Sequence, residues 1–341
     1  MVVPHGRVEK MRVPGSPGSR PNARPAAVHP GRRCWRADQD DDVTGRGEAW
    51  RSALLAVAFV LIWGSAFNAA RVVVLEWPPF WALAIRFVLT APLLVGLALV
   101  TGARWPARAD LGRVALMGLF GTGGYLAFSW WAMALIPSGL VALVTAATPL
   151  VVALGEAVLF GRRPSGMAWA GLALGWGGVA LLGGARLAGH IGDSPGEVLG
   201  VGLALLGAVS QAAGLLAFAP ARGRVDLWSA TAGQSLVSAV LLLALALVME
   251  GAPPSSASPR VWLGLAYSVT IVGVGGYALL FVLLRRFQPS TAAALQLLAP
   301  PVATVIGWAA LGEVLGWADV GGGALTLTGL ALLFRARARE G

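Results

Sequence analysis

Residues 123–138, GGYLAFSWWAMALIPS, recur further along the chain as residues 275–290, GGYALLFVLLRRFQPS. In both copies a Gly-Gly-Tyr triplet is followed, twelve residues after the tyrosine, by a Pro-Ser pair. Later matches keep the same order: Thr148-Pro149 with Ala299-Pro300, and Gly171 with Gly322. The offset between the copies is 151 or 152 residues throughout. An ordered series at a near-constant offset indicates an internal duplication.

The residues around the duplication are too apolar for a protein that faces water on all sides. Hydrophobic residues make up 57% of the 341, charged residues 12%, and the mean hydropathy is +0.72. A soluble domain has about a quarter of its residues charged. We therefore predict an all-α integral membrane protein with ten transmembrane helices, each about 20 apolar residues long. The predicted spans are 52–74, 79–100, 111–134, 138–160, 167–185, 197–217, 227–249, 261–284, 290–311 and 317–335.

Each copy of the duplicated unit contains five predicted spans, the first within residues 51–190 and the second within 196–337. Because five is odd, the second copy enters the bilayer from the opposite side, and the two copies form inverted repeats. Inverted five-helix repeats are frequent in transporters that work by alternating access, with the substrate held between the repeats. A duplicated membrane scaffold or sensor without flux is the alternative.

The arginines give the predicted spans a direction. With both termini in the cytoplasm, fifteen arginines flank the spans on the inside, and only Arg186 and Arg260 lie in outside loops. This bias follows the positive-inside rule. We expect a multi-pass protein of the cell (inner or plasma) membrane, with the lipid bilayer as its surroundings.

The net charge of +10 does not indicate nucleic-acid binding, because the arginines lie in short gaps between apolar segments. Residues 1–50 differ from the rest: they are rich in proline and in both charges, and they predict a disordered tail. The three histidines and Cys34 form no cluster with metal-ligand spacing. We expect no metal, no cofactor and no enzymatic activity.

The chain resembles the drug/metabolite transporter superfamily, in particular the EamA-type permeases with two five-helix units. The resemblance is carried by Trp63-Gly64-Ser65, by Arg86 in the second span and by Leu311-Gly312-Glu313. It implies transport of a small organic metabolite, amino-acid-like compound or drug, favours export, and places Trp63 among the substrate-binding residues. At the end of the fourth span the family usually has Gly-Glu-Arg-Pro, whereas this chain has Gly161-Arg162-Arg163-Pro164. The sequence contains no phosphate-binding Gly-x-x-x-x-Gly-Lys loop, so it does not indicate transport driven directly by ATP.

Two of the ionisable residues within predicted spans stand out, because a charge inside the membrane needs a reason to be present. Arg86 would attract an anionic group such as a carboxylate; alternatively it pairs with Glu76, bonds a backbone carbonyl or reaches outward to the interface. Glu156 is the candidate for proton coupling; alternatively it pairs with Arg163, seven residues on, or with the Arg104–Arg113 loop.

Neutral polar residues and prolines complete the predicted substrate site. Tyr125 and Tyr277 occupy equivalent positions in the two halves and are expected to face one central cavity, or to pack in the core. Paired helix breaks at corresponding positions of two repeats indicate a binding site, and the prolines of the fourth and ninth spans form such a pair. The remaining candidates are Asn68, Pro149, Gln211, Gln234, Gln296 and Pro300; the four amide side chains among them could instead form hydrogen bonds across helices.

Glycines in the fifth and tenth spans, among them Gly171 and Gly322, predict close helix packing. That packing is expected within the chain, with a homodimer contact as the alternative.

Overall fold

The computed structural model describes residues 37–161, 164–187, 195–286, 295–296 and 298–340. The chain divides into two compact units, Met1–Glu48 and Ala49–Gly341. The cavity and the contacts described below lie in the second unit. Its described residues form helices and the turns between them, with no strand in those ranges.

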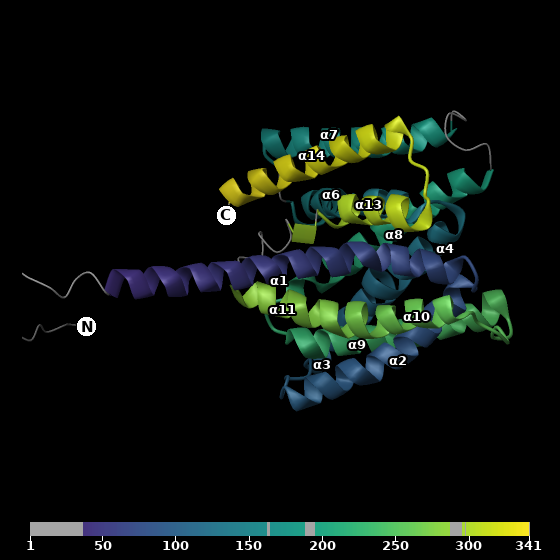
Figure 1. Cartoon of the computed structure of the whole chain (residues 1–341), viewed down its shortest axis with the longest axis horizontal. Coiled ribbons are helices and arrows are strands. Elements are labelled where there is room, and N and C mark those ends of the chain that lie inside the picture. Colours follow the sequence, from purple (N-terminus) through teal and green to yellow (C-terminus); the bar gives the residue numbers. More distant parts are fainter. Residues whose placement is uncertain (1–36, 162–163, 188–194, 287–294, 297, 341) are drawn as a thin grey trace, which may run out of the picture. The chain divides into compact units, whose positions relative to one another are not determined.

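The helices follow one another along the chain as shown in Figure 1. They are α1 (Ala37–Val74), α2 (Pro79–Val100), α3 (Arg108–Leu116), η1 (Met117–Gly124), α4 (Tyr125–Leu135), α5 (Ser138–Thr145), α6 (Thr148–Phe160), α7 (Gly166–Leu187), α8 (Pro195–Phe218), η2 (Ala219–Ala221), α9 (Leu227–Leu245), η3 (Ala246–Glu250), α10 (Pro259–Tyr267), η4 (Ser268–Gly276), α11 (Tyr277–Arg286), α13 (Ala299–Leu311) and α14 (Trp317–Glu340).

Eight of the described helices are long and apolar enough to cross a membrane. Two shorter apolar helices, Gly166–Leu181 and Ala299–Leu311, lie where the fifth and ninth spans were predicted. The first residues of the ninth predicted span, 290–294, lie outside the described residues. The all-helical membrane architecture is thus confirmed, with eight of its ten predicted spans found in the described residues.

Part of the predicted tail is helical. Helix α1 begins at Ala37, so residues 37–50 are helical and continue into the first apolar segment. Residues 1–36, the rest of the predicted tail, lie outside the described residues.

The duplication is visible in the local geometry of both halves. The π-helical segments η1 and η4 each end immediately before a tyrosine, Tyr125 or Tyr277. Helices α6 and α13 begin at the equivalent residues Thr148 and Ala299, each with proline in the first turn. Both end at a glycine with φ 65°, Gly161 or Gly312. The predicted break in the fourth span is present, because α5 ends at Thr145 and α6 starts at Thr148.

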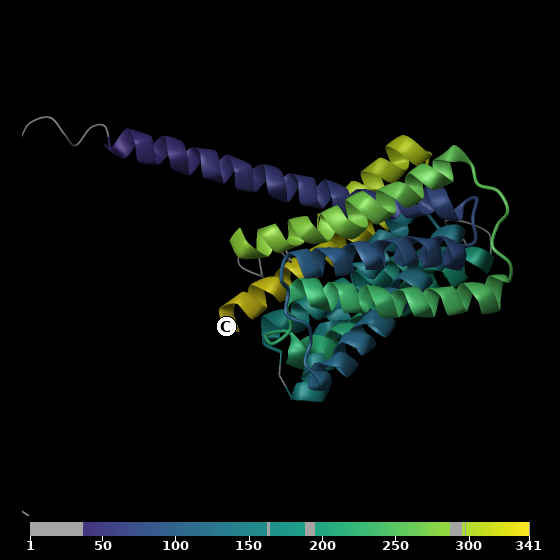
Figure 2. The same ribbon diagram turned by 90° about the horizontal axis from the view of Figure 1, so that it is seen from below.

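Helices from the two halves pack in pairs. Helix α7 lies along α14, and α2 along α9 (Figures 1 and 2). The α7–α14 contact is a close backbone approach, since a Cβ added to Gly329 would collide with the backbone of Gly171 and Gly175. The glycines of the fifth and tenth spans therefore pack against each other within the chain.

Candidate functional site

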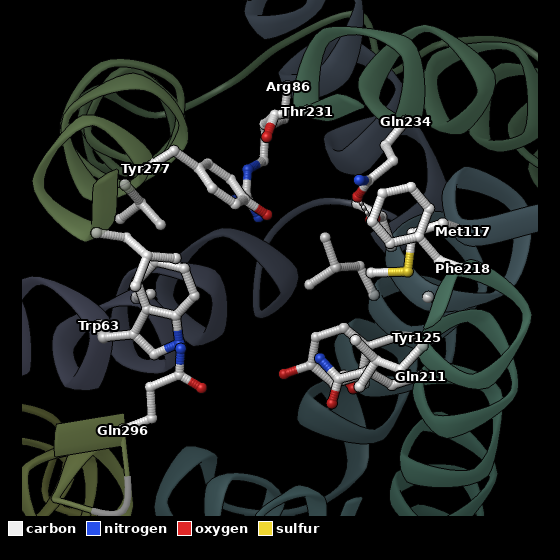
Figure 3. A pocket seen from close by; sticks show the side chains of 18 of the residues that line it. Trp63, Arg86, Met117, Tyr125, Gln211, Phe218, Thr231, Gln234, Tyr277 and Gln296 are labelled. Carbon is white, nitrogen blue, oxygen red and sulfur yellow. Dashed lines mark hydrogen bonds between the residues drawn. The ribbon is translucent and has the colours of Figure 1, made fainter. Parts of the chain in front are cut away.

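A cavity of about 620 Å³ lies among helices of both halves. Its walls come from α1, α2, η1, α4, α8, α9, η4 and α11. Most of the lining is apolar or aromatic, with a few polar side chains directed inward (Figure 3). This size and composition are typical of small-molecule sites.

Seven predicted site residues line this cavity: Trp63, Arg86, Tyr125, Gln211, Gln234, Tyr277 and Gln296. Four do not: Asn68, Pro149, Glu156 and Pro300. The two prolines lie in the first turns of α6 and α13, a position that tolerates proline. Asn68 belongs to a buried polar cluster described below.

Arg86 is the buried cation of the cavity. Its residue is 8% exposed, and the guanidinium lies 5.6 Å from the centroid of the Trp130 ring and 5.5 Å from that of Phe87. No ion pair to Arg86 occurs among the described residues, and Glu76, the predicted alternative partner, is exposed. Aromatic faces attract a cation but do not neutralise it. The positive charge is therefore available to a ligand in the cavity.

Two tyrosines face the cavity from opposite walls. Tyr125 begins α4 and Tyr277 begins α11, each directly after a π-helical segment. Figure 3 shows both hydroxyl groups directed into the space between them. Trp63 packs edge-on against Tyr277, with ring centroids 5.7 Å apart. π-Helical segments are frequent at functional sites, and here the duplication places one beside each tyrosine.

Gln234 is oriented by a neighbour on the cavity wall. Thr122 Oγ1 donates a hydrogen bond of 3.1 Å to Gln234 Oε1. A glutamine side chain accepts through its oxygen and donates through its nitrogen, so this bond leaves the amide NH₂ group as the donor. Gln234 can therefore offer hydrogen bonds to an acceptor in the cavity.

The two ends of the cavity differ. One end reaches Arg222 and Leu227, around the turn between α8 and α9, where Arg222 is exposed. The other end stops at Trp130 and Met133, each 1% exposed. Ile136, the residue that ends α4, is fully buried. The cavity is thus accessible from the Arg222 end and closed at the end of α4.

A buried polar cluster lies just beyond the closed end. Glu313, between α13 and α14, accepts hydrogen bonds from Ser138 N and Ser138 Oγ, both at 2.7 Å, and from Gly139 N at 3.3 Å. Asn68 Oδ1 lies 3.0 Å from Ser138 Oγ, and its Nδ2 donates to Ala303 O at 3.2 Å. Asn68, Ser138 and Glu313 are 5%, 0% and 8% exposed.

Glu156 lies on α6, partly buried and away from the cavity lining. Arg163, its predicted alternative partner, lies outside the described residues. A coupling role for Glu156 stays a prediction.

The sequence analysis missed several residues on the cavity wall. Thr122, Leu126, Ser129, Trp130 and Met133 line the cavity together with Tyr125. Each of them lies three or four residues from another member of the set, the spacing that puts side chains on one helix face. Extending the face of Tyr125 along its own span would have identified them.

Comparison with known proteins gives a consistent result. Residues 50–184 and 198–335 each match the EamA-like transporter family. The chain is 28% identical over 264 residues to the uncharacterized inner membrane transporter YedA of Escherichia coli K12, covering 76% of this chain and 82% of that protein. It is 29% identical over 283 residues to the "probable terminal-alkyne amino-acid exporter" of Streptantibioticus cattleyicolor, covering 82% and 92%.

A third relative is the "probable amino-acid metabolite efflux pump" of Salmonella typhimurium, 30% identical over 295 residues, covering 82% of this chain and 93% of that protein. A solved crystal structure superposes with a TM-score of 0.58 at 26% identity, covering 85% of this chain and 99% of that one.

Proposed function

The chain belongs to the EamA-like transporter family, and on that premise we propose that it exports a small carboxylate-bearing metabolite, such as an amino-acid-like compound, across the inner membrane. Transport would proceed by alternating access to the cavity between the two halves. Two relatives are named as exporters of amino-acid compounds, which supports both the direction and the chemical class.

Arg86 is the observation that carries the substrate class. It is buried, it faces the cavity, and no carboxylate is among the described residues that line that cavity. A buried charge without a partner is costly, so a ligand carboxylate that pairs with Arg86 would bind favourably. The apolar remainder of the wall suits an apolar side chain on the same ligand.

We further propose that the bundle crosses the membrane ten times as two inverted five-helix halves with both termini in the cytoplasm. The eight long apolar helices, the equivalent geometry of the two halves and the arginine distribution support this topology. In that orientation the Arg222 end of the cavity faces the cytoplasm.

Proton coupling through Glu156 belongs to this proposal. If Glu156 carries the coupling proton, Glu156→Gln abolishes the response of transport to an imposed pH gradient while substrate exchange without a gradient persists. Gradient-driven transport that survives the substitution would remove Glu156 from the mechanism.

The experiment that tests transport itself uses purified protein in proteoliposomes preloaded with unlabelled L-leucine. Accumulation of radiolabelled leucine by counterflow, above the level in protein-free vesicles, is the expected result. A panel of the proteinogenic amino acids, tested in the same vesicles, extends the search for the carboxylate substrate. If a folded, monodisperse preparation moves none of these compounds, the scaffold or sensor role replaces the proposed one.

A further inference from the structure

We infer that Glu313 is a latch that holds the cavity closed at the end of α4, and so is a positioning residue for transport. The inference deepens the proposed function and rests on it, because a latch matters only where the closed end opens during the cycle. The contacts that carry it join the two halves of the molecule at the place where the cavity stops.

The latch joins residues of both repeats. Glu313 follows α13 in the second family match, whereas Ser138 and Gly139 begin α5 in the first. Both backbone N–H groups belong to the first turn of α5, where the helix has no carbonyl acceptor of its own for them. A carboxylate at that position satisfies the free N–H groups and interacts favourably with the helix dipole. One side chain from the second half therefore fixes the start of a helix in the first half.

The chain folds locally in a way that delivers the carboxylate. Helix α13 ends at Gly312, whose φ of 65° is the left-handed conformation that glycine adopts readily. Glu313 N then donates to Gly307 O at 3.1 Å, which turns the side chain back along the helix. A Cβ on Gly307 would collide with Glu313 Oε2, so glycine is needed there. The two glycines together bring Glu313 against α5.

Two further residues connect the latch to the cavity wall. Asn68 lies on α1, two residues beyond Ala66, which lines the cavity. Its Oδ1 accepts a hydrogen bond from Ser138 Oγ. Arg71, one turn further along α1, donates to Met133 O and interacts electrostatically with Glu313. Met133 is the last wall residue of α4. Opening this end requires α1, α4, α5 and the Glu313 segment to separate, and that breaks the same contacts.

At the position equivalent to Glu313, the sequence of the first half has no carboxylate. Gly161 and Gly312 are equivalent, since each ends its helix with φ 65°. The residue after Gly312 is Glu313, whereas the residue after Gly161 is Arg162. A guanidinium donates hydrogen bonds and accepts none, so it cannot satisfy the N–H groups of a helix start. The asymmetry agrees with a cavity that is accessible at one end and closed at the other.

Sided labelling of a cysteine tests the latch without any knowledge of the substrate. Cys34 is the single cysteine, so Cys34→Ser gives a cysteine-free parent, and Ala66→Cys adds a reporter on the cavity wall. A membrane-impermeant maleimide is applied to right-side-out and to inside-out vesicles. In the parent we expect labelling from the Arg222 face and protection from the opposite face. Equal labelling from both faces would overturn the closure on which the latch depends.

Glu313→Ala, Glu313→Gln and Ser138→Ala are then compared in that background. Loss of one hydrogen bond to a charged group shifts a two-state equilibrium about tenfold. Labelling from the protected face should therefore rise about tenfold in Glu313→Ala and less in Glu313→Gln, which keeps one acceptor oxygen. Ser138→Ala, which removes only a hydroxyl group, should raise labelling from the protected face as well.

Glu250→Gln is the matched control. Glu250 caps the start of α2 through Phe80 N and Trp81 N, at 3.0 and 2.8 Å, but is not part of the cavity wall. The Glu250→Gln substitution should leave the sidedness of labelling unchanged. Unchanged sidedness in all three latch variants, at normal folded yield, would refute the latch while leaving the counterflow result intact. Lack of counterflow with a latch-dependent labelling pattern would instead refute the transport proposal alone.

Discussion

The guanidinium of Arg86 lies over the indole ring of Trp130, 5.6 Å from its centroid, and both side chains are almost completely buried. Arg86 comes from α2 and Trp130 from α4, so the contact holds two walls of the cavity together. The ring orients the cation without neutralising it, which keeps the charge available to a ligand.

Replacing Trp130 separates its packing role from its effect on Arg86. Trp130→Ala should lower stability by about 3–5 kcal/mol, because a large buried side chain is deleted. Trp130→Phe keeps an aromatic face and should lower it less, while weakening leucine binding about threefold through the poorer cation–π contact. Thermal unfolding in detergent and ligand titration measure the two effects. Equal leucine affinity in Trp130→Phe and wild type would show that the ring does not orient Arg86.

Introducing a carboxylate into the cavity should reverse its charge preference. Gln234→Glu places a negative charge in the cavity that holds Arg86, so uptake of leucine should fall at least about tenfold, a charge-pair effect of more than 1.4 kcal/mol. Uptake of isoamylamine, which has the same apolar chain and no carboxylate, should rise. Gln234→Met, similar in size and uncharged, is the control and should not favour the amine. Competition against labelled leucine in proteoliposomes measures all three.

The glycine contact between α7 and α14 gives a stability prediction with a control on the same helix. Gly329→Ala should destabilise the protein by about 1–3 kcal/mol, because its Cβ meets the backbone of Gly175. Gly321→Ala has only Leu181 Cδ2 at 3.8 Å, an ordinary contact, and should be tolerated. The thermal unfolding temperatures of the two variants measure this difference in stability. If Gly329→Ala unfolds at the same temperature as Gly321→Ala, the close backbone approach is not needed for stability.

Much of the architecture could be predicted from the sequence because it depends on patterns that repeat. The length of an apolar segment predicts a membrane helix, and a constant offset between matching residues predicts two related halves. Both patterns can be read directly from the order of the residues. The same duplication identified Tyr125 and Tyr277, which the structure places on one cavity. The ten-span topology itself, and the binding role of the cavity residues, remain predictions.

The details that escaped prediction depend on contacts between distant segments. Nothing local to Asn68 indicates that it faces Ser138, 70 residues away, instead of the cavity. Glu313 lies just beyond the ninth predicted span, and the glycine turn at Gly312 returns it to the buried start of α5. Pro149 and Pro300 lie in the first turns of α6 and α13 and are not among the residues that line the cavity. Pattern recognition locates elements; it does not show which tertiary neighbour satisfies a buried polar group.

The central claim is that Arg86 binds the carboxylate of the substrate, and calorimetric titration of purified protein tests it most directly. L-Leucine should bind wild type at least about tenfold more tightly than leucinamide, as expected for one hydrogen bond to a charged group. Arg86→Gln should abolish that difference and Arg86→Lys should keep part of it. Arg260→Gln, at an exposed arginine outside the cavity, should behave as wild type. Leucine binding by Arg86→Gln that is as tight and as selective as in wild type would contradict the account.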